Sequence, residues 1–140
     1  MSLTRVDNWR AAFAAEVERL RRLPFAWGTH DCGVGLAGNL TLALTGVDVA
    51  APWRGRYTTQ AGALRVLRND GFSTLGDLVA SVLPEHDHRS RARVGDVGAI
   101  EAEAFGHALC VVDFDRVHVL TPDGFGTLDR TAMVRAFKVG

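Results

Sequence analysis

The chain lacks the features that mark membrane, secreted and nucleic-acid-binding proteins. None of its 140 residues belongs to a run near the roughly 20 apolar residues of a membrane span. The first residues, MSLTRVDNWRAAF, lack the basic, apolar and small-residue regions of a secretory signal. Lys and Arg together number 16, as do Asp and Glu, so no net charge attracts nucleic acid or an anionic membrane. We therefore expect a protein made in the cytoplasm, with no membrane span and no nucleic-acid partner.

Cysteine is scarce as well. The two cysteines, Cys32 and Cys110, cannot form a disulfide framework, and a cytosolic pair is more often reduced. The chain also has no internal repeat and no low-complexity stretch, and its length matches one hydrophobic core. We expect a single domain over residues 1–140, in which each thiol needs its own explanation.

The first half of the chain has helical periodicity. Between residues 4 and 23 apolar residues recur at spacings of three and four, and Thr4 and Asp7 have the spacing of a capping box. Further helices are expected from Cys32 to Gly46, from Thr58 or Thr59 to Gly71, and from Ser73 to the residue before Pro84. Three glycines at positions 33, 35 and 38 weaken the helix expected from Cys32 to Gly46, which suggests that another element passes very close to it.

The second half has the pattern of antiparallel strands. After a polar loop at residues 84–96, five short segments rich in Val, Ile, Leu and Phe alternate with turn residues. They are DVGAIEA (96–102), GHALCVVDF (106–114), DRVHVLTP (115–122), GFGTLDR (124–130) and MVRAFKV (133–139). Helices followed by a β-meander predict an α+β fold in which the helices cover one face of the sheet.

The segment PFAWGTHDCGVGLAG, residues 24–38, places Cys32 in the first turn of a helix. Free backbone N–H groups and the helix dipole favour a thiolate there, so we expect a lowered pKa for Cys32. A nucleophilic cysteine also requires a neighbouring base. His107 opens a strand on the face that the helices cover, and is the candidate. Asp31 is a candidate helix cap or substrate ligand.

These residues resemble, in their order, the NlpC-type cell-wall peptidases of the papain-like superfamily. The shared motifs are Trp-Gly, Asp31-Cys32-Gly33 before an apolar helix, Gly95-Asp96-Val97 and Gly106-His107, each of the last two opening a strand. They cover roughly residues 24–121. The WGTHDC motif is similar to that of a short branch associated with phage tails.

The resemblance implies a papain-like fold with Cys32 as nucleophile and His107 as general base, and no cofactor or metal. It implies a peptidoglycan stem peptide as substrate, typically hydrolysed between D-Glu and a diamino acid. It also implies a phage or phage-like tail component that acts at the cell wall, with other tail proteins as partners. Relatives place a polar residue on the next strand to orient the imidazole. His118 fits this position by residue type. Thr121, and less so Asp123, fits it if DFDR is a tight turn and a bulge shifts the register.

Two positions depart from the family pattern. Phe25 stands where many relatives have a tyrosine whose hydroxyl helps to hold the oxyanion, and Gly33 stands where relatives often have a serine that binds the substrate. Losing one oxyanion donor typically costs about 10²- to 10³-fold in rate. The alternative function is therefore a weak or inactive papain-like module with a structural role in a tail tip.

Other candidate residues have simpler interpretations. Trp27 packs beneath the nucleophile turn or forms a wall of the substrate groove, and Trp53 and Tyr57 are expected to line the cleft or a partner surface. Cys110 should face away from His107 as a buried structural thiol. The HDH sequence at residues 86–88 has no second ligand pair at zinc-like spacing, so no metal site is expected.

Overall fold

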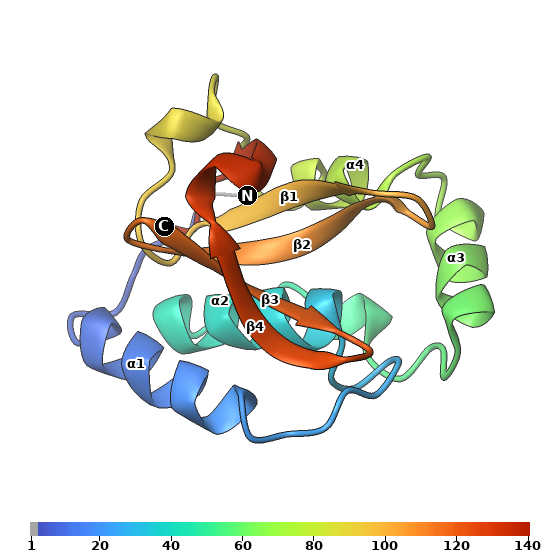
Figure 1. The fold of residues 1–140 in the computed structure, drawn as a ribbon, viewed down its shortest axis with the longest axis horizontal. Helices are drawn as coiled ribbons and strands as arrows, with labels where there is room; N and C mark the ends of the chain where they lie inside the picture. The colour runs from blue at the N-terminus through green and yellow to red at the C-terminus, as the bar shows by residue number, and fades with distance from the viewer. Residues whose placement is uncertain (1–2) are drawn as a thin grey trace.

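The computed structural model describes residues 3–140 and confirms the α+β class, with N-terminal helices packed on a C-terminal antiparallel sheet (Figure 1). The helical elements are α1 (Trp9–Leu20), the π-helical segment η1 (Cys32–Ala37) that continues as α2 (Gly38–Thr45), the 3₁₀ turn η2 (Ala51–Trp53), α3 (Gln60–Asn69) and α4 (Leu75–Ala80). Another 3₁₀ turn, η3 (Arg89–Arg91), precedes the sheet. Within residues 3–140, no helix is long and apolar enough to span a membrane.

The five predicted strands are present, each within two residues of its predicted ends. They are β1 (Val97–Ala102), β2 (Gly106–Asp113), β3 (Arg116–Thr121), β4 (Gly124–Asp129) and, after the 3₁₀ turn η4 (Arg130–Ala132), β5 (Met133–Phe137). Asp113 pairs with Arg116, so DFDR is the predicted tight turn.

The position of β5 corrects the predicted meander. The strand order is β4-β3-β2-β1-β5, so the last strand crosses to the opposite edge of the sheet and pairs with β1. β5 buries Met133 and Phe137 on opposite faces, which requires a position that is covered on both sides. The outer edge beside β4 offers no such cover, because the last three residues of β4 are exposed. Arg130 holds the crossing turn by donating hydrogen bonds to the carbonyl groups of Phe114 and Ala92.

Each face of the sheet has its own hydrophobic cluster. The larger cluster lies between the sheet and the helices, and the smaller one lies on the opposite face. Cys110 belongs to the smaller cluster and is fully buried, as predicted, and this burial raises its pKa to about 12.

The first helix is shorter than predicted. α1 begins at Trp9 with Asn8 as N-cap, and no side chain caps it, so the predicted capping box of Thr4 and Asp7 does not form. The residues before it are held by distant parts of the chain. The Val6 N–H donates to the carbonyl of Leu44, and the Arg5 side chain reaches the C-terminal segment.

The other helix ends follow the sequence more closely. Thr59 caps α3 by accepting a hydrogen bond from the Gly62 N–H, and Thr74 caps α4 in the same way. α2 ends at Gly46, whose φ of 75° is in the left-handed region that glycine adopts without strain. α4 ends at Ala80, several residues before Pro84.

Candidate active site

The turn before the candidate nucleophile is organised by Asp31. Its Oδ1 accepts hydrogen bonds from the N–H groups of Gly33 and Val34, both at 3.0 Å, so it caps η1 as the sequence suggested. Its Oδ2 accepts one hydrogen bond from the Gly28 N–H at 3.0 Å and another from the Tyr57 hydroxyl at 2.6 Å. Asp31 is 3% exposed, and four hydrogen bonds occupy its lone pairs, which favours the capping role over contact with a substrate amine.

Two of the three glycines after Cys32, Gly35 and Gly38, allow a close approach, and their neighbours are the turn before Cys32 and the segment after α2. A Cβ on Gly35 would lie 2.6 Å from the Cα of His30, and one on Gly38 would lie 2.7 Å from the Cβ of Ala50. The glycine that faces His107 is Gly76 of α4, where a Cβ would lie 2.6 Å from the imidazole Nδ1. Part of the site therefore rests on a helix that the sequence did not single out.

Cys32 is the first residue of η1, as predicted, but its ionisation is the opposite of the expected one. Burial raises the pKa of the thiol to about 12, and the nearby Asp31 carboxylate adds to this effect. The N–H groups of Leu109 and of Cys32 itself favour the thiolate, but they do not offset the loss of water. The predicted lowering of the Cys32 pKa is therefore wrong, and the thiol is protonated at neutral pH.

His107 lies near the start of β2 on the same face as the helices. Its Nδ1 accepts a hydrogen bond from the Gly76 N–H at 3.2 Å, so the neutral ring carries its proton on Nε2. Burial lowers the His107 pKa, and the nearby Arg135 guanidinium lowers it further. Arg135 is itself held by Asp77 at 2.9 Å and Glu85 at 2.8 Å. The imidazole is therefore neutral at pH 7.

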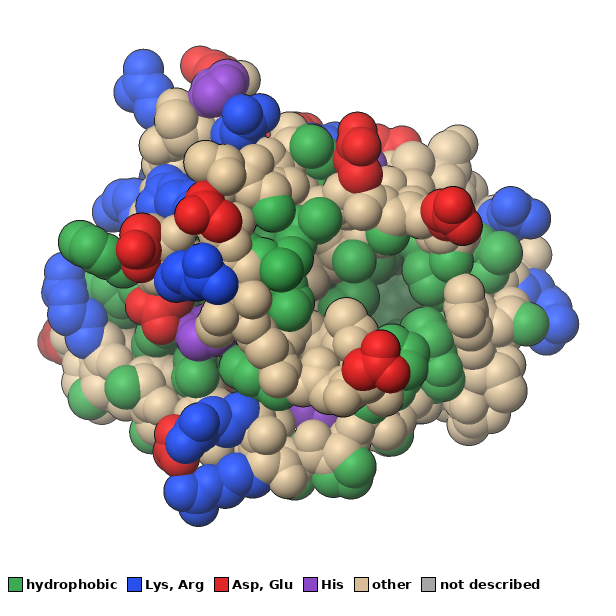
Figure 2. Space-filling model, viewed as in Figure 1, with side chains coloured by type: hydrophobic (Ala, Val, Ile, Leu, Met, Phe, Trp, Pro, Cys, Tyr) green, Lys and Arg blue, Asp and Glu red, His purple; other side chains and the backbone are tan. Residues whose placement is uncertain are grey.

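Cys32 and His107 line one cavity of about 200 Å³. Figure 2 shows its mouth as a hollow with hydrophobic walls, between the β1–β2 hairpin, α3 and the β3–β4 turn of Figure 1. Among residues 3–140 no hydrogen bond joins the two side chains, so they share a site without forming a preassembled pair.

The two candidates for the third position lie in different places. His118 pairs across the sheet with Val111 and does not line the cavity. Its Nε2 donates to Asp113 at 2.8 Å, and its ring packs between Phe13 and Phe125. Thr121 lines the cavity, but its hydroxyl accepts a hydrogen bond from the Asp123 N–H at 3.2 Å. The contact that orients the imidazole is therefore the Gly76 N–H.

The predicted aromatic residues gather around the cavity. Trp27, Trp53 and Tyr57 all line it, and Trp27 packs edge-on against Phe25 with ring centroids 4.9 Å apart. The Tyr57 hydroxyl bonds to Asp31, and burial raises the Tyr57 pKa strongly, so the phenol remains a donor. The sequence suggested Tyr57 as a cleft residue but did not indicate its bond to the cap.

Comparison with known protein families assigns the chain. Residues 4–139 match the model of the domain of unknown function DUF6950. The chain belongs to the DUF6950 family. No curated protein and no solved structure matches it.

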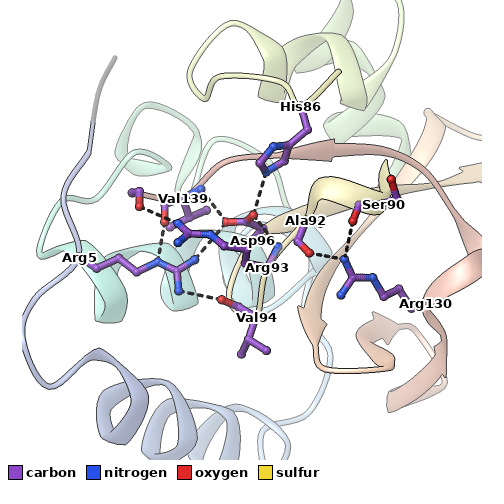
Figure 3. Close-up of polar contacts among 10 residues, drawn as sticks. Arg5, His86, Ser90, Ala92, Arg93, Val94, Asp96, Arg130 and Val139 are labelled. Atoms are coloured by element: carbon purple, nitrogen blue, oxygen red, sulfur yellow. Dashed lines mark hydrogen bonds and ion pairs between the residues drawn. The ribbon is translucent and has the colours of Figure 1, made fainter. Parts of the chain in front are cut away.

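In this DUF6950 chain Asp96 of the Gly-Asp-Val motif forms a structural junction just before β1 (Figure 3), and Val97, the first residue of β1, lines the cavity. Asp96 is fully buried, and its Oδ1 accepts hydrogen bonds from the Arg5 guanidinium at 3.1 Å and the Val139 N–H at 3.0 Å. Its Oδ2 accepts from the Arg93 N–H and from His86 Nε2, both at 2.9 Å. Asp96 therefore joins the segments around Arg5 and Val139 to the start of the sheet.

The histidines of the HDH sequence also have structural partners. His86 bonds to Asp96, and His88 caps η3 by accepting a hydrogen bond from the Ser90 N–H at 3.1 Å. Within residues 3–140, no group of three His, Cys, Asp or Glu side chains is placed to hold a metal ion.

Proposed function

We propose that the protein is a cysteine amidohydrolase of the papain-like type, with Cys32 as nucleophile and His107 as general base and acid. The observation that carries the proposal is the shared cavity, which is lined by both a helix-terminal thiol and a strand-borne imidazole. The order of the helix, the strand and their motifs resembles that of NlpC-type peptidases, which supports the same assignment.

The ionisation of the two groups selects the form of the mechanism. Both are neutral at pH 7, because burial raises the Cys32 pKa and lowers the His107 pKa. The proton therefore moves from sulfur to the imidazole during the attack, in place of a preformed thiolate–imidazolium pair. His107 then protonates the leaving amine, and water hydrolyses the thioester.

The imidazole must turn before it can accept this proton. Its unprotonated nitrogen, Nδ1, faces the Gly76 N–H, and at 3.2 Å this hydrogen bond is at the long end of the usual range. Rotation about the Cβ–Cγ bond exchanges this contact for one with the thiol. Substrate binding in the cavity is the step that would favour the rotated ring.

The proposed substrate is an amide bond of a peptidoglycan stem peptide, and the proposed setting is a phage or phage-like tail that meets the cell wall. Both rest on the WGTHDC, Gly-Asp-Val and Gly-His motifs in their order along the chain. The partners in that setting would be neighbouring tail proteins.

Incubation of the protein with peptidoglycan fragments tests this function. We expect a new free amine, detected by mass spectrometry, which Cys32→Ala and His107→Ala abolish. Cys110→Ala is the matched thiol control, because Cys110 lies on the opposite face of the sheet, and His88→Ala is the histidine control. Absence of a new amine, or release that survives Cys32→Ala, would rule out the mechanism.

The protonation of Cys32 and the orientation of His107 favour a second candidate function. The thiol is protonated, the imidazole faces Gly76, and Phe25 offers no hydroxyl to an oxyanion. These features fit a module whose chemistry is lost and whose role is structural. A stable complex with neighbouring tail proteins, without cleavage of any peptide, would support this second function over the first.

A further inference from the structure

The cavity beside Cys32 is almost entirely apolar. Aliphatic side chains from α3, α4 and the sheet form most of its wall, and they include Val66, Leu67, Leu75, Leu78, Leu109 and Leu120. An apolar cavity of about 150 Å³ in another protein is dry and binds benzene. The present one measures about 200 Å³, so it is large enough for an apolar group of several carbon atoms.

The cavity offers no partner for a charged ligand. In the part of the chain that the structure describes, no Lys, Arg or Glu lines it, and Asp31 is the one ionised side chain that does. The Asp31 carboxylate is 3% exposed and already accepts four hydrogen bonds. A carboxylate or ammonium group in this space would lose water without gaining an opposite charge.

Charged groups gather instead near His107. Arg135 lies next to the imidazole and is paired with Asp77 and Glu85. In the proposed mechanism His107 protonates the leaving amine, so this charged side of the site faces the leaving group. The apolar wall that extends from Cys32 is then the side that holds the acyl group.

We propose that this cavity is an acyl-binding site for an uncharged, aliphatic group attached to the carbonyl carbon that Cys32 attacks. The inference rests on the proposed function and narrows its substrate. In a stem peptide, an alanyl carbonyl meets this condition, whereas a glutamyl carbonyl brings a carboxylate that the cavity cannot pair. Longer aliphatic acyl groups fill the cavity more fully.

A series of p-nitrophenyl esters from acetate to octanoate tests the acyl site, because only the acyl chain changes. A sulfur–carbon bond forms and the carbon–oxygen bond to p-nitrophenolate breaks, with the thiol proton passing through His107. Water then releases the carboxylic acid and restores the thiol. We expect kcat/KM to rise by roughly fourfold for each methylene that enters the cavity.

A pair of alanines on α3 provides matched variants. Ala63 is half-buried and lines the cavity, whereas Ala61 on the same helix is exposed and does not. Ala63→Leu fills part of the space, so it should lower the ratio of octanoate to acetate turnover at least tenfold. Ala61→Leu should leave that ratio as it is.

Ligand binding to the Cys32→Ala protein separates this inference from the proposed chemistry. The probe is N-phenyl-1-naphthylamine, an uncharged fluorophore, and the competitors are pentanamide and glutaramate, a five-carbon amide that ends in a carboxylate. We expect pentanamide to displace the probe at a concentration at least tenfold below that of glutaramate.

Each combination of results decides one of the two proposals. Selective probe displacement with no turnover of any ester or peptide supports the acyl site and overturns the proposed activity. Turnover without a chain-length preference, together with no probe binding, supports the activity and overturns the acyl site. Equal displacement by pentanamide and glutaramate also overturns the acyl site.

Discussion

The two buried aspartates, Asp31 and Asp96, have different structural roles. Asp31 and Asp96 are 3% and 0% exposed, and each accepts four hydrogen bonds, two on each carboxylate oxygen. Three donors to Asp31 are backbone N–H groups within three residues of it, and the fourth is the Tyr57 hydroxyl. The same side chain thus builds a local turn at one place and a long-range junction at the other.

The donors explain the difference. Asp96 receives a guanidinium from residue 5 and an N–H from residue 139, so it fastens both ends of the chain to β1. Arg5 is a buried cation whose side chain is 7% exposed, and Asp96 is its charge partner. Asp31 receives neutral donors only and faces the cavity. One aspartate therefore stabilises the fold, and the other shapes the site.

Asp96→Asn should lower the free energy of unfolding more than any other change considered. The amide removes the charge that compensates Arg5 and turns an N–H₂ group toward two donors. Breaking one side of a buried ion pair typically costs about 3–5 kcal/mol, so we expect a loss of this size in the free energy of unfolding, measured by urea denaturation. The rate at which iodoacetamide labels Cys32 should not change.

Asp123→Asn is the control for that variant, because Asp123 is exposed near the β3–β4 turn. It should change the free energy of unfolding by no more than about 0.5 kcal/mol. A loss of stability from Asp96→Asn that is as small as this would show that the junction does not hold the fold together.

Asp31→Asn should have a smaller effect on stability and a distinct effect on the thiol. The amide group would face the donors Gly28 N–H and the Tyr57 hydroxyl, which we expect to cost about 2–3 kcal/mol of unfolding free energy. The Asp31 charge raises the Cys32 pKa, so its removal should lower that pKa.

The measurement is the rate of Cys32 alkylation against pH. With a pKa of about 12, the wild-type rate should rise tenfold per pH unit from pH 7 to pH 10, and Asp31→Asn should shift this line toward lower pH. The pKa of Cys32 is raised on folding, so its share of stability is complete below about pH 8.5 and is lost as the pH rises toward 12. A wild-type rate that levels off near pH 7 would contradict the protonated thiol.

The sequence predicts the hydrogen bonds of Asp31 much better than those of Asp96. The cap is a local pattern, because Asp31 directly precedes the helix that it caps. The strands are also visible locally, as short apolar segments between turn residues. Two of the four partners of Asp96, Arg5 and Val139, lie 91 and 43 residues away, and no local pattern identifies such pairs. The crossing of β5 to β1 was missed for the same reason.

The ionisation of Cys32 shows the same limit. Its place in the first turn of a helix is visible in the sequence and predicts a thiolate. The burial that outweighs this effect comes from helices and strands that pack around the sulfur only in the folded chain. Likewise, the residues around the His107 ring, Gly76 and Arg135, come from a helix and a strand that no motif connects to it.

The smallest effect should come from Tyr57→Phe, which removes one of the four hydrogen bonds to Asp31 and leaves its charge in place. Tyr57 is half-buried, so we expect a loss of about 1.5 kcal/mol, near the lower end for a hydrogen bond to a charged group. Amide hydrogen exchange should quicken at residues 28–34, because their turn depends on Asp31. Arg56→Gln, which breaks an exposed ion pair with Asp70 in the same connecting segment, should not affect this exchange. Equal exchange in the two variants would mean that Asp31 shapes the site without Tyr57, and that the backbone donors alone hold the nucleophile turn.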